Sequence, residues 1–583
     1  MSSSRQQLRL EIADTAARHF RVRHRIAELA DDSIELYMPI WTPGSYTVRD
    51  YAGFVVDLEV SGPGNPVLEK VESNRWVVTG CEGELEAVYR VYAPELGVRS
   101  NDISEQHAFV HPPGTFLAVE GRESDSFELQ VDAPDGWKVF TALEERDGKF
   151  IAEDYDRLLD CPIEMGDHEE REFTVKGRRH RLVVHGEGNL DLDRVIADTQ
   201  KIVEHEVDFF GGEPPYNEYL FILHLTGGAG GGLEHMDSSV LGWPRLEFRP
   251  EKEYRKFLTL VAHEFFHVWN VKRIRPEVLL EYDYARPAYS RLLWIFEGWT
   301  TYYDEMICCR SCSSGPKGLL EAMAEHVQTE ASRPGGGVQS LEQSSFDAWI
   351  KLYRANPDTQ NTQTNYYLKG LLVAWLLDLH LRTASGGEKS LDDVMLYLWN
   401  EVALKGSGLP EGGAGALIQS ATGIDCSDFL ATHVENPGTL DFAAALATIG
   451  LQLQRKPDKE PDGAKAWLGA SIGVKEGLSR LGVVYHGGSA HAAGLMAGDE
   501  VIALGDLKVG RGLKSRLQNY RPGESASWSA FRDGRLIHGE ILFQEDPVGK
   551  LEIKPLPDAS EAQKQAFQAW SSCSFDELTQ KKS

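Results

Sequence analysis

The sequence contains no run of about eighteen uninterrupted apolar residues, the length that a transmembrane helix requires. Its longest apolar run, from Leu371 to Leu377, stops at Asp378 and is typical of a helix in a protein core. The first eight residues also lack the apolar centre of a signal peptide. We therefore expect a chain that has no membrane partner.

Cysteine is scarce and its pattern is irregular. The seven cysteines, at positions 81, 161, 308, 309, 312, 426 and 573, form an odd set without paired spacing. Such a set argues against a disulfide framework. We interpret these residues as reduced thiols and expect a cytoplasmic location.

Positive charge is also in deficit, with Lys+Arg 60 against Asp+Glu 89 and a net charge of −29. A surface of this charge repels phosphate backbones and anionic membranes, so nucleic acid is not an expected partner. The hydrophobic content of 42% and charged content of 26% are those of an ordinary globular protein. At 583 residues the chain is too long for one core, and three or so domains are expected.

A histidine pair lies at the end of an expected helix that begins near Lys252: His263 and His267 are four positions apart. Side chains at that spacing project from one face of a helix, so both imidazoles can reach one metal ion. Glu264 lies beside the same ion without needing to bind it. The pattern predicts a zinc peptidase with His263 and His267 as ligands and Glu264 as the base that activates water.

The short motif can also arise by chance, because two histidines in a buried helix can simply be hydrogen-bonded core residues. A third ligand is needed, and Glu297 is the candidate. Apolar residues surround it over residues 290–300, and a lone buried carboxylate is costly unless it is paired or binds a metal. Two histidines and one glutamate leave the fourth zinc position open for water and substrate.

At these positions the sequence resembles the glycyl aminopeptidase family, gluzincins that carry a PDZ domain. The matching residues are the run from His263 through Trp269, Asn270, Lys272 and Pro276, then Glu297-Gly298-Trp299-Thr300 and Tyr302-Tyr303. An upstream stretch resembles the signature of the family's N-terminal domain, although it could equally be a tight turn with aromatic packing: Trp41-Thr42-Pro43-Gly44-Ser45-Tyr46, then Arg49-Asp50-Tyr51. The resemblance implies an aminopeptidase that prefers small N-terminal residues such as Gly or Ala.

The predicted fold class is multidomain α+β. Short runs of alternating apolar and polar residues predict an N-terminal β-sandwich-like domain over residues 1–175. The resemblance implies a thermolysin-like, mainly helical catalytic domain over residues 176–456 and a PDZ domain over residues 463–548. Residues 549–583 are expected to form a tail with a short helix. Residues 311–365, which are rich in Pro, Asn, Thr and Gln, are expected to include a loop over the cleft.

A glycine-rich segment, residues 227–232, precedes Leu233 and Glu234. No Gly-Lys-Ser/Thr follows, which argues against a phosphate-binding loop. Instead, a strand with a bare backbone at Gly232 lets an extended peptide form main-chain hydrogen bonds. The segment resembles the Gly-x-Met-Glu-Asn strand of the aminopeptidase N group, which implies that Gly232 and Leu233 line the substrate and that Glu234 holds its free amine. The alternative is an exposed loop glutamate.

A tyrosine pair opens the apolar helix after residue 365. Tyr-x-Lys-Gly at this position resembles the catalytic tyrosine of the aminopeptidase N group, and the match falls on Tyr367, with Tyr366 as the competing choice. Its phenol would stabilise the negative charge that develops on the carbonyl oxygen. Asp304 and Thr301 are both candidates for the group that accepts a hydrogen bond from a zinc-bound histidine.

Together these residues predict a zinc aminopeptidase with one zinc ion per chain and with free-amine peptides as substrates. Two other functions stay open. A zinc endopeptidase would use Glu234 only structurally, whereas a non-catalytic PDZ scaffold would carry a vestigial metal site. A peptide ligand of the PDZ domain is a further expected partner, and the sequence leaves the oligomeric state open.

Overall fold

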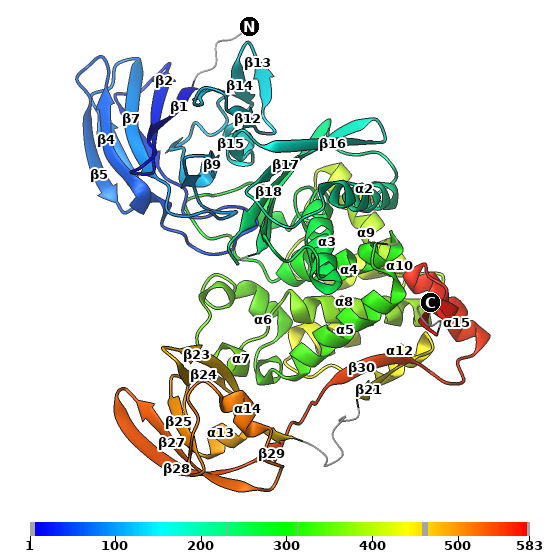
Figure 1. The fold of residues 1–583 in the computed structure, drawn as a ribbon. Coiled ribbons are helices and arrows are strands. Elements are labelled where there is room, and N and C mark those ends of the chain that lie inside the picture. Colours follow the sequence, from blue (N-terminus) through cyan, green and yellow to red (C-terminus); the bar gives the residue numbers. More distant parts are fainter. Residues whose placement is uncertain (1–5, 229, 312, 457–464, 580–583) are drawn as a thin grey trace. The chain divides into compact units, whose positions relative to one another are not determined.

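The computed structural model describes residues 6–228, 230–311, 313–456 and 465–579 (Figure 1). The chain forms two compact units. The first unit contains residues 1–289, 303–313 and 398–410, and the second contains residues 290–302, 314–397 and 411–583.

The first unit opens with a large β-sheet that is drawn in blue and cyan in Figure 1. Its strands, in spatial order, are β13 (Glu144–Arg146), β14 (Lys149–Ala152), β11 (Phe127–Asp132), β1 (Gln6–Asp14), β2 (His19–Ala27), β7 (Glu84–Tyr92) and β4 (Val55–Ser61). Buried residues alternate with more exposed ones along β7, the pattern of a sheet with one face on the core.

Two four-stranded sheets complete the N-terminal region. One contains β10 (Ala118–Val119), β3 (Ser33–Tyr37), β6 (Arg75–Thr79) and β5 (Val67–Glu72), and the other contains β12 (Lys138–Phe140), β15 (Ile163–Gly166), β9 (His107–Val110) and β8 (Asp102–Ile103). The short helix α1 (Tyr155–Leu159) precedes β15. This region confirms the predicted N-terminal all-β domain.

A mixed five-stranded sheet follows, with the order β16 (Glu169–Val175), β17 (Arg178–His185), β18 (Glu218–Thr226), β20 (Ser238–Pro244) and β19 (Gly231–Glu234). The strands β17, β18 and β20 run parallel, and β19 pairs antiparallel with β20 at the edge of the sheet. Helix α2 (Leu192–Phe209) connects β17 to β18, and helix α3 (Glu251–Phe266) packs against β19 and β20. The sheet thus presents the end of the glycine-rich strand to the helix with the histidine pair.

The second unit is helical in its middle region, as expected for an α+β chain. Its helices are the π-helix η4 (Trp294–Trp299), α5 (Gly315–Ala331), α6 (Leu341–Phe346), α7 (Thr359–Thr362), α8 (Leu368–Ala384), α9 (Leu391–Tyr397), α10 (Ala414–Thr422), α11 (Ser427–Leu430) and α12 (Ala443–Thr448). Helix α4 (Thr300–Arg310) continues from η4, and the division between the two units falls within it. Most residues of α8 are buried, as expected from its apolar sequence.

The C-terminal strands form an antiparallel sheet in the order β23 (Ala470–Lys475), β24 (Leu478–Val484), β25 (Glu500–Leu504), β27 (Ser525–Arg532) and β28 (Arg535–Leu542), with β26 (Leu507–Lys508) on β25. Two short helices accompany it, α13 (Ser489–Ala492) and α14 (Leu513–Leu517). Outside it, β21 (Leu451–Arg455) pairs with β30 (Leu551–Pro555), and β22 (Ala466–Trp467) pairs with β29 (Gln544–Glu545). The predicted terminal helix is present as α15 (Glu561–Ser571).

Within the described ranges, no helix is both long and apolar enough to cross a bilayer. Six cysteines lie in these ranges and all are buried: Cys81, Cys161, Cys308, Cys309, Cys426 and Cys573. The predicted boundaries of the domains, including those of the PDZ domain, stay predictions.

Gly298 allows η4 to approach α8 closely in the second unit. A Cβ at Gly298 would lie 2.6 Å from the Cα of Gly370 and 2.8 Å from the carbonyl oxygen of Tyr366. Both atoms belong to backbone, so the two helices would have to separate. We expect Gly298→Ala to destabilise the protein by about 1–3 kcal/mol, as overpacking of a core does.

A urea titration of the full chain would measure this loss. Gly337→Ala is the matched control, because a Cβ at Gly337 meets no atom within 4 Å. That control should change stability by less than about 0.5 kcal/mol. Equal midpoints for the two variants would contradict the close approach of the helices.

Candidate active site

Helix α3 positions two imidazoles side by side. The helix begins at Glu251 and ends at Phe266, with His267 as the C-cap residue. Two carboxylates, Glu251 and Glu253, lie in its first turn, where they interact favourably with the helix dipole. The ring centroids of His263 and His267 are 4.7 Å apart, with an angle of 87° between the ring planes. The four-residue spacing has therefore brought both rings to one face, as the sequence predicted.

Each of these histidines hydrogen-bonds through Nδ1. His263 Nδ1 lies 3.0 Å from Asp304 Oδ2, and His267 Nδ1 lies 2.6 Å from the carbonyl oxygen of Asn270. When Nδ1 donates its proton to an oxygen in this way, Nε2 carries the lone pair that binds a metal. Of the two candidates for the hydrogen bond to a histidine, the structure favours Asp304, since the hydroxyl of Thr301 donates to the carbonyl oxygen of Glu297.

Glu264 lies in a buried acidic group next to the histidines. Ligand atoms of Glu234, Glu264 and His267 all lie within 4.8 Å of one another. Burial raises the pKa of Glu264 to about 7, a rise that His263 and His267 oppose and Glu234 reinforces. The atom Glu264 Oε2 is buried without a hydrogen-bond partner among the described residues, and so is Glu234 Oε1. A carboxylate with a pKa near neutrality and an unpartnered oxygen is suited to exchanging protons.

The bare backbone of Gly232 makes room for Glu264. A Cβ at Gly232 would lie 2.1 Å from Glu264 Oε1, so any larger residue would displace the carboxylate. The carbonyl oxygen of Gly232 accepts a hydrogen bond of 2.7 Å from Arg99, and the side chain of Leu233 is fully buried. Contact between this strand and a peptide would therefore use the backbone. No local motif had indicated that Arg99 lies here.

The stretch from Trp41 to Tyr46 reaches Glu234 through Gly44. A Cβ at Gly44 would lie 2.3 Å from Glu234 Oε1, and the residue has a positive φ of 81°. The indole of Trp41 anchors the stretch by donating to the carbonyl oxygen of Asp283 over 2.8 Å. The stretch forms a tight turn, in which the amide of Ser45 donates to the carbonyl oxygen of Thr42 over 3.0 Å, and it also borders Glu234, so both interpretations of it stay open.

In the second unit, Glu297 lies within η4 with only 2% of its surface exposed. Tyr367 precedes α8, and Tyr353 is within hydrogen-bonding distance of both candidate phenols, 2.8 Å from Tyr367 and 3.2 Å from Tyr366. Burial, followed by the charge of Glu297, raises the pKa of Tyr367 well above its ordinary value, so its phenol keeps its proton. Sequence reasoning did not identify Tyr353.

Two family models and one solved structure match this chain over long ranges. The model of the Peptidase M61 N-terminal domain matches residues 7–167, and the model described as M61 glycyl aminopeptidase matches residues 256–373. The chain is similar to the crystal structure of an aminopeptidase N family protein from Idiomarina loihiensis, with a TM-score of 0.91 and 30% identity over 97% of this chain and 99% of the other. No curated protein matches the sequence.

More distant similarities are weak. An M1 zinc metallopeptidase from Deinococcus radiodurans has 14% identity and a TM-score of 0.46, over 75% of this chain and 94% of the other. Yeast LTA4 hydrolase has 15% identity and a TM-score of 0.46, over 75% of this chain and 68% of the other.

The fold and the family matches together define a metallo-aminopeptidase. The chain belongs to the M61 glycyl aminopeptidase family.

Proposed function

We propose that the chain is a zinc-dependent aminopeptidase that removes small N-terminal residues, Gly or Ala, from peptides with a free amine. The observation that carries this proposal is the buried group of Glu234, Glu264 and His267, whose ligand atoms lie within 4.8 Å of one another. In this group His267 is a candidate metal ligand, Glu264 is a candidate base, and Glu234 is an anion that can bind the ammonium group of a substrate. Gly44 lies next to Glu234, and this close contact supports a substrate whose N-terminal side chain is small.

His263, His267 and Glu297 would hold the zinc ion. Both histidines have Nδ1 engaged with oxygens, which leaves Nε2 for the metal. Glu297 is buried within η4, and a buried carboxylate is costly unless it is paired or binds a metal. This burial supports Glu297 as the third ligand. Zinc in such a site lowers the pKa of coordinated water to roughly 7 and polarises the scissile carbonyl.

Glu264 would take a proton from the attacking water and pass it to the leaving amine. Tyr367 would donate its phenolic hydrogen to the substrate's carbonyl oxygen as negative charge develops there. Glu234 would accept hydrogen bonds from the terminal ammonium, so that only the first peptide bond aligns with Glu264.

Free and N-acetylated glycyl and alanyl amides test this function, with and without a chelator. We expect cleavage of the free-amine substrates alone, loss of cleavage after chelation and recovery when zinc is returned. Equal cleavage of acetylated peptides would contradict the aminopeptidase assignment and favour an endopeptidase. Cleavage that survives complete metal removal would contradict the zinc mechanism.

The two tyrosines can be separated by paired substitutions. Tyr366 is fully buried, whereas Tyr367 is partly exposed, which supports Tyr367 as the group that reaches substrate. We expect Tyr367→Phe to lower kcat by about 10²–10³-fold with little change in KM, as when one oxyanion donor is lost. Tyr366→Phe should lower kcat much less. Steady-state kinetics on alanyl amide would compare the two variants. A larger loss of kcat in Tyr366→Phe than in Tyr367→Phe would assign the stabilisation of the carbonyl oxygen to Tyr366.

We further propose that the C-terminal strands form a PDZ domain. Strand β23 lies at the edge of its sheet, where a peptide strand could add. The module also contacts the helical part of its own unit: the amide of Asn361 donates to the carbonyl oxygen of Val484 over 2.9 Å, and Tyr485 donates to Gln360 over 2.7 Å. These contacts support a packing role for the module in addition to any ligand binding.

A further inference from the structure

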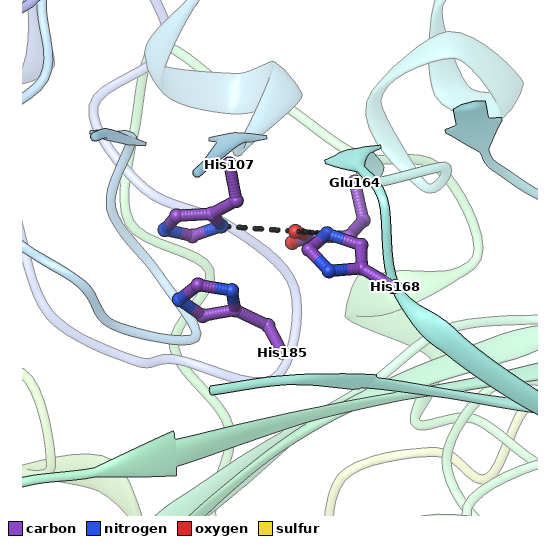
Figure 2. Close-up of side chains that lie close together, drawn as sticks. All are labelled: His107, Glu164, His168 and His185. Carbon is purple, nitrogen blue, oxygen red and sulfur yellow. Dashed lines mark hydrogen bonds and ion pairs between the residues drawn. The ribbon is translucent and has the colours of Figure 1, made fainter. Parts of the chain in front are cut away.

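A second group of metal-binding side chains lies in the first unit, outside the candidate active site. It contains His107 on β9, Glu164 on β15, His168 in the turn after β15, and His185 at the end of β17. One ligand atom from each residue lies within 4.8 Å of the others. Figure 2 shows the three imidazoles and the carboxylate facing a common space. The group spans residues 107 to 185 and forms no local motif in the sequence.

Glu164 is at the centre of the group and is fully buried. Its Oε1 lies 2.9 Å from His107 Nδ1 and 2.6 Å from His168 Nε2. Its other oxygen, Oε2, lies 2.9 Å from Nε2 of His224, on β18. A buried carboxylate needs hydrogen-bond donors or a cation, and here imidazole nitrogens converge on it from several strands.

The orientation of His107 is set from outside the group. Its Nε2 lies 2.8 Å from Asp102 Oδ2, and Arg18 pairs with the other oxygen of Asp102. A carboxylate that accepts the proton of one ring nitrogen leaves the lone pair on the other nitrogen, which is how proteins orient metal-binding histidines. In His107 that other nitrogen, Nδ1, faces Glu164 and the common space.

His185 distinguishes a metal site from a hydrogen-bonded core. Hydrogen bonds to Glu164 account for the other imidazoles, but no hydrogen bond links His185 to any residue in the described ranges. Its ring instead stacks on that of His107, with centroids 3.5 Å apart and an angle of 12° between planes. A hydrogen-bonded core would not need the imidazole of His185. A tetrahedral metal site formed by three histidines and one carboxylate requires it as a ligand.

We propose that His107, Glu164, His168 and His185 bind a second divalent transition-metal ion, with zinc preferred. Imidazole nitrogens suit late first-row metals, and four protein ligands make a closed site of the structural kind. Metal bonds of roughly 2.0–2.1 Å place tetrahedral ligand atoms about 3.3 Å apart. Because a metal binds an imidazole in its ring plane, the half-buried His185 would have to turn out of its stack on His107 to reach that geometry.

The ion would join two sheets of the first unit. His107 and Glu164 come from the four-stranded sheet with β9 and β15, whereas His185 comes from the five-stranded sheet that also contains β19. Metal binding would therefore stabilise the contact between the N-terminal β region and the sheet that carries Glu234. The site is structural, and its existence does not depend on the proposed peptidase function.

Metal content of the full chain tests the proposal. Each protein is incubated with zinc, freed of loosely bound metal on a chelating resin and measured by plasma mass spectrometry. We expect two zinc ions per chain in the natural protein, one in the double variant His263→Ala/His267→Ala, and none when His185→Phe is added to that double variant. Phenylalanine keeps a ring to stack on His107 but has no nitrogen for the metal.

Thermal unfolding gives a readout that is independent of activity. Zinc should raise the unfolding midpoint of the double variant by several degrees and should leave that of the triple variant unchanged. His180→Phe is the matched control: His180 lies on the same strand and stacks on Phe173 at 4.8 Å, away from the group, so this substitution should leave the metal content unaltered. If His185→Phe prevents folding, His168→Gln removes a different ligand with the same expected loss.

A folded double variant that holds no zinc would overturn the proposal and leave the group as a hydrogen-bonded core. So would a triple variant that still holds one zinc ion, because that metal would be bound elsewhere. Loss of peptidase activity in the double variant with one zinc retained would leave the second site intact, which separates this proposal from the catalytic one.

Discussion

Replacing Glu264 by Gln is expected to lower kcat for glycyl and alanyl amides by about 10²–10⁴-fold, the contribution of a positioned general base. The amide is nearly the same size as the carboxylate, so the contact with Gly232 is kept, but it cannot accept a proton from water. Because Glu264 is not an expected ligand, metal content should stay unchanged. Steady-state kinetics and metal analysis of the same preparation measure both quantities.

Glu253→Gln is the control for this substitution. Glu253 lies on the same helix, but it forms an ion pair of 3.0 Å with Lys256 and takes no part in the buried group. Its replacement should change kcat by less than twofold. If Glu264→Gln retained more than about a tenth of the natural rate, proton transfer would have to be assigned to another residue.

Local patterns were sufficient to predict the elements that carry the candidate site. Helix α3 begins at Glu251, one residue before the start that the sequence indicated. The glycine-rich segment ends in the expected strand, β19. These predictions succeeded because helical spacing, strand composition and glycine content are properties of short segments.

Contacts between distant segments could not be predicted in the same way. The approach of Gly44 to Glu234, and that of Arg99 to Gly232, depend on how the N-terminal β region packs on the five-stranded sheet. The second histidine group has the same origin, because its members share no sequence spacing. Such sites are created by tertiary packing, and a single sequence gives no signal for them.

The loop expected within residues 311–365 stays a prediction. Residues 315–331 of this range form helix α5. Leu319, Met323 and Val327 follow one another at intervals of four positions and are buried, which is the pattern of a helix face.

The second large effect is expected from Glu234→Gln. The natural carboxylate would form charge-assisted hydrogen bonds with the terminal ammonium of a peptide, worth about 1.5–3 kcal/mol. The variant should therefore lose about 10–150-fold in kcat/KM on free-amine substrates, the same energy converted at about 1.4 kcal/mol per tenfold. Acetylated peptides lack the ammonium and should stay uncleaved, as they are expected to be with the natural protein.

An unchanged unfolding midpoint beside a lower kcat/KM isolates the role of Glu234, because a general loss of folding would lower both together. Glu213→Gln, which alters an exposed carboxylate in the same unit, should leave kcat/KM unchanged. If Glu234→Gln also left kcat/KM unchanged, Glu234 would serve only to pack against Gly44. Selection for a free N-terminus would then have to come from steric closure of the site, since no charge would be holding the amine.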